Sequence, residues 1–267
     1  MTRSLCLLGL IFLGVVAVSG SSSRSLKQFV PFVALTCDFQ GPFPYMVSLK
    51  TQAGEHLCGG VLISKTSVLT AAHCVDQRSS PRSNPYPQLS IGGFDLDNPI
   101  EKRWTVGVTM HPGWTGLRQF GNDLAILKMN APTCVKTIPA IGTHQLFSMP
   151  SIFLGFGRTS TNGPFPNKLL AGKFTAFGEQ TCRDNQAYPI SGNAGETYCA
   201  KGPSGTGGVC EGDEGGPSIL RPSVTEFSDM ISGIASYTSG TGQCSDKNTY
   251  AVFTDVTYYK TWIENNM

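Results

Sequence analysis

The sequence predicts an all-β protein built from two closed antiparallel sheets, with one helix at the C-terminus. Short runs rich in β-branched and aromatic residues recur along the 267 residues, separated by Gly, Pro, Asn and Ser. Helix signals are sparse before the last stretch. The runs also divide into two sets around residues 139–150. Many short strands at such spacing are typical of β-barrels, although a generic two-sheet domain fits the pattern nearly as well.

Each set contains several expected strands. The first set covers residues 45–50, 60–64, 67–70, 88–92, 104–110 and 124–128. The second covers residues 151–154, 169–177, 217–220, 230–236 and 251–255. Residues 256–265 have the apolar spacing of an amphipathic helix.

The first twenty residues have the features of a signal peptide. Residues 1–3 give a basic start, residues 5–18 are apolar, and small residues follow up to Gly20. A signal anchor is the alternative, but the apolar run is shorter than the roughly 20 residues that span a bilayer. We expect a signal peptide at 1–20, a short segment at 21–31, and a secreted protein with no membrane association after processing.

Composition excludes several classes of function. The formal net charge is only +2, and no basic run occurs, so nucleic-acid binding is not expected. Eight cysteines remain after Cys6 leaves with the signal, and an even number in an exported chain favours disulfides. No Cys-x-x-Cys pair or helical His-x-x-x-His pair is present, so we expect neither a metal nor another cofactor.

Three segments carry the candidate catalytic residues. Residues 70–74 read Thr-Ala-Ala-His-Cys, residues 121–127 read Gly-Asn-Asp-Leu-Ala-Ile-Leu, and residues 210–217 read Cys-Glu-Gly-Asp-Glu-Gly-Gly-Pro. Alone, His73 could be a structural histidine and Asp123 a turn residue. In this order, the three segments resemble the trypsin and chymotrypsin family of serine proteases, and the resemblance extends over the whole mature chain.

The resemblance implies a fold and a disulfide pattern. The fold is two six-stranded antiparallel β-barrels within a homology domain at 32–267. The first barrel covers about 32–140, the second about 141–255, and the helix about 256–265. The implied pairs are Cys58–Cys74, Cys182–Cys199 and Cys210–Cys244, with Cys37–Cys134 as the fourth.

The resemblance makes His73 and Asp123 remnants of a catalytic triad, with the amides of Gly212 and Glu214 forming the oxyanion hole. Glu214, however, stands where the family has its nucleophilic serine. A carboxylate has no hydroxyl for His73 to deprotonate, and its negative charge repels the oxyanion that the site stabilises. We therefore expect no peptide cleavage.

The implied specificity pocket also departs from the family. Its base is Gly208, which offers no acidic group to a Lys or Arg side chain, and Thr238 and Ala251 form its walls. Tyr237 lies beside it, in the segment that lines the substrate groove. Trypsin-like specificity is therefore not expected, while binding of an extended peptide by strand addition remains open.

The activation end of the chain departs as well. The stretch that matches the usual new N-terminus begins at Phe32 and follows Pro31, a poor site for a trypsin-like activator. We therefore expect Asp213 to lack its usual cationic partner, and to find hydrogen bonds, rise in pKa or turn outward. The loop would then resemble a zymogen, unless Glu214 itself occupies the amides of Gly212 and Glu214.

Together these features predict a non-catalytic serine protease homologue that binds a protein partner, an extended peptide or another macromolecule. The main alternative is an active endopeptidase with an unconventional nucleophile. Heparin-like or lectin-like binding is a third possibility, suggested only by the slight positive charge.

Overall fold

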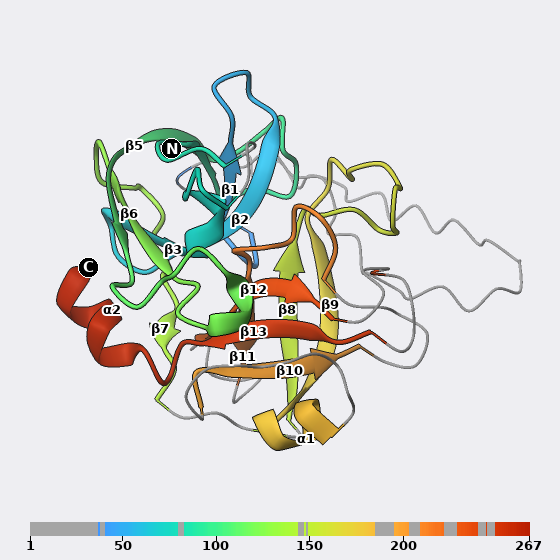
Figure 1. Ribbon diagram of the computed structural model, residues 1–267. Helices are drawn as coiled ribbons and strands as arrows, with labels where there is room; N and C mark the ends of the chain where they lie inside the picture. The colour runs from blue at the N-terminus through green and yellow to red at the C-terminus, as the bar shows by residue number, and fades with distance from the viewer. Residues whose placement is uncertain are drawn as a thin grey trace, which may run out of the picture.

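The computed structural model describes residues 37, 41–79, 83–143, 147, 149–184, 195–202, 209–221, 229–239, 244 and 249–267. Two β-barrels lie side by side, and a helix at the C-terminal end packs near the first (Figure 1). The expected signal peptide, the segment 21–31 and the pocket residue Gly208 lie outside the described residues.

The first barrel is closed and antiparallel, with the strand order β1-β2-β3-β6-β5-β4. Its side chains alternate along the strand, so that Val47 and Leu49 lie on one face, in the hydrophobic core, and Ser48 lies on the other face, where it is buried against His56. Its strands are β1 (Met46–Lys50), β2 (His56–Leu62), β3 (Ser67–Thr70), β4 (Gln88–Ile91), β5 (Glu101–Met110) and β6 (Ala125–Met129). Each coincides with or overlaps one of the runs expected from the sequence.

The second barrel has the order β11-β8-β9-β10-β13-β12 and closes through pairing of β11 with β12. Its strands are β8 (Pro150–Gly155), β9 (Leu170–Phe177), β10 (Thr197–Lys201), β11 (Pro217–Leu220), β12 (Met230–Thr238) and β13 (Ala251–Asp255). A short strand, β7 (Ala140–Ile141), pairs with β12 in parallel. The prediction of two six-stranded barrels is therefore confirmed, and closure removes the exposed strand edges.

The C-terminal helix begins later than the sequence indicated. Residues 256–259 form turns, and the helix α2 runs over Lys260–Asn266 rather than 256–265. The Asp255 carboxylate explains the delay, because its Oδ1 accepts hydrogen bonds from the amide of Thr257 at 2.8 Å and from its hydroxyl at 2.7 Å. A second short helix, α1 (Glu179–Asp184), was not expected.

Four disulfides link Cys37–Cys134, Cys58–Cys74, Cys182–Cys199 and Cys210–Cys244, the pairs that the family resemblance implied. Two of them flank the candidate site, since Cys74 follows His73 and Cys210 begins the Glu214 loop. None of the helices among the described residues has the length and apolar character of a membrane span.

The two barrels are also joined by packing. One hydrophobic cluster continues from the first barrel into the second and includes Ile219, Ile231 and the α2 residue Ile263. At the surface, Lys168 of the second barrel forms an ion pair of 2.7 Å with Asp95 of the first. The seam between the barrels is therefore a fixed junction, and the candidate catalytic residues lie along it.

Candidate active site

His73 is held by a buried carboxylate. The short 3-10 turn Ala72–Cys74 carries the histidine, and its Nδ1 lies 2.7 Å from Asp123 Oδ2. The backbone amide of His73 also donates to Asp123 Oδ1 at 2.9 Å. Because a carboxylate only accepts, Nδ1 carries the proton in the neutral ring, which leaves the lone pair on Nε2. His73 is therefore oriented as a base, as in a serine protease triad.

Asp123 is fully buried and is held in its charged form. The hydroxyl of Ser236 on β12 also donates to its Oδ2. Burial by itself raises the pKa of Asp123, but the electrostatic interaction with His73 and the hydrogen bonds from His73 and Ser236 outweigh burial, so the pKa lies below its ordinary value. Both barrels thus hold the Asp123 carboxylate, the first through His73 and the second through Ser236.

The lowered pKa of Asp123 predicts a loss of stability in acid. The carboxylate contributes stability that is complete above its ordinary pKa of 3.8 and disappears as the pH falls through the lower folded value. Unfolding of the wild type and of Asp123→Asn should be compared by urea titration between about pH 6 and about pH 2. The difference in unfolding free energy is expected to shrink below about pH 4. A constant difference over this range would contradict the assignment.

The Glu214 carboxylate occupies an amide of the expected oxyanion hole. Its Oε2 accepts a hydrogen bond of 2.7 Å from the backbone N–H of Gly212. The Glu214 carbonyl in turn accepts one of 2.7 Å from Gly59 of the first barrel, so the residue is fixed at the seam. The side chain thus lies against one of the two donors that a substrate oxygen would need, whereas the exception foreseen for the zymogen-like loop required the Glu214 amide as well.

Asp213 is inside the protein, not turned outward. Only 1% of the residue is exposed. Its Oδ1 accepts from the amide of Gly157 at 2.8 Å and its Oδ2 from the amide of Cys210 at 3.0 Å. Of the alternatives open from the sequence, the outward orientation is wrong, and hydrogen bonds to backbone amides hold the carboxylate.

His56 contacts the turn that contains Gly212 and Glu214, a role that the sequence did not reveal. Its Nε2 lies 2.8 Å from the Gly212 carbonyl oxygen and its Nδ1 lies 2.8 Å from Ser48 Oγ. The carbonyl can only accept, so Nε2 carries a proton and the Ser48 hydroxyl donates to Nδ1 of the neutral ring. The backbone of Gly212 is thereby fixed on both sides of its Cα, by His56 at its carbonyl oxygen and by Glu214 at its amide.

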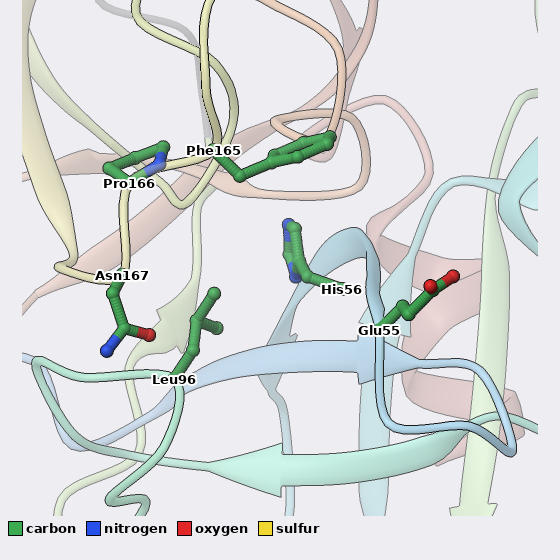
Figure 2. Close-up of a pocket in the computed structure, with 6 residues that line it drawn as sticks. All are labelled: Glu55, His56, Leu96, Phe165, Pro166 and Asn167. Carbon is green, nitrogen blue, oxygen red and sulfur yellow. The ribbon is translucent and has the colours of Figure 1, made fainter.

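A hollow of about 350 Å³ lies beside His56. Figure 2 shows the ring of Phe165 and the neighbouring Pro166 on one side of the imidazole, with Leu96 and Asn167 on another. The walls are mostly apolar, and both nitrogens of His56 are already engaged. Apart from the exposed Glu55 at its edge, this hollow therefore suits an apolar side chain more than a charged one.

Arg118 also approaches Glu214, a contact that the sequence did not reveal. It lies on the 3-10 turn Arg118–Phe120, and its guanidinium is 3.9 Å from Glu214 Oε1. This distance exceeds a hydrogen bond, and the two side chains are 36% and 18% exposed. The attraction between them is therefore a solvent-screened ion pair of modest strength.

The predicted pocket residues lie together at the end of β12 and β13. Thr238 pairs with Ala251 across the two strands, and Tyr237 precedes them at the groove. The Thr238 hydroxyl donates a hydrogen bond to the Val209 carbonyl, which ties the end of β12 to the segment before Cys210. Gly208, the expected base, lies outside the described residues.

One group of side chains has metal-ligand types. Ligand atoms of Cys58, His73 and Cys74 lie within 4.8 Å of one another. The two sulfurs form a disulfide of 2.05 Å, however, and metal binding requires deprotonated thiols. The cluster therefore does not have the chemistry of a metal centre.

Comparison with known proteins agrees with this geometry. The family model for trypsin matches residues 38–263. The chain belongs to the trypsin family. Chymotrypsin-C of Rattus norvegicus is 30% identical to this trypsin-family chain over 238 residues, covering 84% of each protein. Chymotrypsin-like elastase family member 1 of Bos taurus is 27% identical, covering 96% of this chain and 97% of the elastase.

Two further relatives share the domain. Transmembrane protease serine 11G of Rattus norvegicus is 28% identical over 230 residues, and the chain spans about half of that protein's length. Neuropsin, a serine protease expressed in the limbic system of mouse brain, has a structure that superposes with a TM-score of 0.70 at 25% identity, covering 84% of this chain and 95% of neuropsin. The chain therefore has the chymotrypsin-like serine protease fold.

Proposed function

We propose that this trypsin-family protein is a secreted serine protease homologue that does not cleave peptides and instead binds a macromolecular partner. The observation that carries the proposal is the position of Glu214, whose carboxylate accepts the Gly212 amide at 2.7 Å. A serine at this place would leave that amide open to the substrate oxygen. The glutamate instead covers the donor and places a negative charge where an oxyanion would form.

Neither Glu214 nor the nearby Ser218 supplies a nucleophile. The Glu214 carboxylate is a poor nucleophile toward an amide, because the tetrahedral intermediate that it would form expels the carboxylate again in preference to the far more basic amine. Ser218 is 1% exposed, and its hydroxyl lies 3.1 Å from that of Ser232 inside the second barrel. Loss of the catalytic serine lowers turnover by roughly a millionfold in a comparable triad enzyme, so peptide cleavage would be practically absent.

Secretion is proposed on two observations. The first twenty residues have signal-peptide features, and the domain contains four disulfides, which persist in oxidising compartments. A secreted scaffold that keeps a fixed cleft without its nucleophile retains the means to bind a chain without the means to cut it. The partner would be a protein or an extended peptide.

Labelling with a fluorophosphonate probe tests the loss of catalysis. The folded mature protein is expected to take up no probe and to release no fragments from casein, while trypsin treated in parallel does both. The heat-denatured protein serves as the background control. Covalent labelling of the folded protein that heating abolishes, or steady casein hydrolysis, would support the alternative of an active endopeptidase and overturn the proposal.

A further inference from the structure

A second hollow, of about 380 Å³, opens on the Arg118 side of Glu214. It is lined by Ser79, Gly116, Leu117, Arg118, Gln119 and Tyr237. These residues come from the loop after His73, from the segment before Asp123 and from the end of β12. Both barrels therefore contribute to its walls, as they do for the His73–Asp123 pair.

Arg118 supplies the positive charge of this hollow, and its guanidinium N–H groups can still donate hydrogen bonds. Among the described residues, its guanidinium forms no hydrogen bond, and the nearest carboxylate oxygen is Glu214 Oε1 at 3.9 Å. The other oxygen, Oε2, is engaged by the Gly212 amide. A guanidinium carries five N–H donors in a planar fork that fits a carboxylate in two parallel hydrogen bonds. Arg118 can therefore accept a carboxylate that enters the hollow.

The surroundings of Arg118 favour such a contact. Its backbone is fixed in a tight turn, because its carbonyl accepts from the Gly121 amide at 3.2 Å. Leu117 and Tyr237 give the hollow apolar walls beside the charge. Leu117 is 50% exposed, so water reaches this hollow and the charged contact is of modest strength, while Arg and Tyr are residue types enriched among those that contribute most to binding energy at interfaces.

We propose that this hollow binds an acidic side chain of the partner, with the Arg118 guanidinium as the group that recognises its carboxylate. The inference rests on the proposed function, since it assigns the partner's chemistry at the same cleft. The two hollows then differ along the cleft, with an apolar one at His56 and a cationic one at Arg118. Glu214 lies between them and competes with the incoming carboxylate for Arg118.

The test uses a blocked synthetic peptide, acetyl-Gly-Glu-Leu-Glu-Leu-Glu-Gly-amide, and counterparts with Gln or Lys in place of Glu. Calorimetry on the folded mature protein should show that the Glu peptide binds about threefold tighter than the Gln peptide, because a partly exposed guanidinium attracts a carboxylate more than a neutral amide, with solvent screening. Arg118→Gln should abolish this preference. Arg118→Lys should retain part of it, since a point charge replaces the planar fork.

Two further variants make the assignment specific. Glu214→Gln should tighten binding of the Glu peptide several-fold, because it removes the competing charge while keeping an acceptor for the Gly212 amide. Arg158→Gln is the matched control, since Arg158 is a partly exposed arginine beside the same loop but is paired with Glu211 at 2.9 Å. It should leave the preference for the Glu peptide over the Gln peptide unchanged, although its guanidinium lies 4.1 Å from the centre of the Phe165 ring at the other hollow.

Several results would overturn the inference. These are equal binding of the Glu and Gln peptides by the wild type, tighter binding of the Lys peptide, an intact preference in Arg118→Gln, an equal loss in Arg158→Gln, or weaker binding in Glu214→Gln. Fluorophosphonate labelling separates this failure from that of the proposed function. An unlabelled protein without a carboxylate preference refutes only the assignment of Arg118, whereas a labelled protein refutes the non-catalytic function.

Discussion

Replacing Asp229 with Ala is expected to lower the free energy of unfolding by about 3 kcal/mol. Asp229 precedes β12 and is 6% exposed. It receives two parallel hydrogen bonds from Arg221, at 2.6 Å and 2.7 Å, and a third from the hydroxyl of Tyr45. Tyr45 lies just before β1 and is fully buried, so this carboxylate links the two barrels.

The loss is large because removal of Asp229 leaves Tyr45 and Arg221 without their hydrogen-bond acceptor. The Tyr45 hydroxyl would be buried without an acceptor, which costs about 1–3 kcal/mol. Burial and the hydrogen bond to Asp229 raise the pKa of Tyr45 well above its ordinary value, so the Tyr45 hydroxyl does not ionise near neutral pH. The Arg221 side chain is 26% exposed and can reach water, which limits its share of the loss.

Urea unfolding of the variant measures this loss. The matched control is Glu264→Ala, which breaks the exposed ion pair between Glu264 and Lys260 one turn apart on α2. That change is expected to cost less than about 0.5 kcal/mol. If Asp229→Ala cost no more than Glu264→Ala, the buried carboxylate would not be holding the barrels together.

The sequence located the parts of the site that depend on local motifs. His73 and Asp123 were expected as a pair, and the structure places their side chains 2.7 Å apart. Their positions follow from the strands that carry them, since β3 leads into the His73 turn and β6 begins just after Asp123. Alternating apolar residues fix the register of such strands, so the residues at their ends are fixed as well.

The contacts that could not be foreseen join segments far apart in the chain. Neither Arg118 nor His56 stands in a motif of its own, yet they reach Glu214 and Gly212 once the barrels pack. β10 was missed for a different reason. Its five residues, Thr-Tyr-Cys-Ala-Lys, contain no Val, Ile, Leu or Phe and so do not form an apolar run, and their burial comes from pairing with β9 and β13.

Replacing Gly215 with Ala is expected to cost about 3 kcal/mol, and to loosen the turn that holds Glu214. The backbone of Gly215 has φ +78°, where a side chain is strained by about 1–2 kcal/mol. A Cβ there would also lie 2.3 Å from Thr70 Oγ1 and 2.4 Å from the Gly59 carbonyl oxygen. Both atoms belong to the first barrel, so the added methyl group would push the barrels apart at the site.

Gly54→Ala separates these two causes. Gly54 has a similar φ of +89°, but nothing lies within 4 Å of the Cβ position. Its replacement should therefore cost only the backbone strain, about 1–2 kcal/mol, and should leave binding at the cleft unchanged. Guanidinium unfolding of both variants gives the difference, which isolates the close packing of the Glu214 turn on Thr70 and Gly59. Equal losses in the two variants would mean that the turn is free to move away from the first barrel, and Glu214 would then not be fixed against the Gly212 amide by the seam.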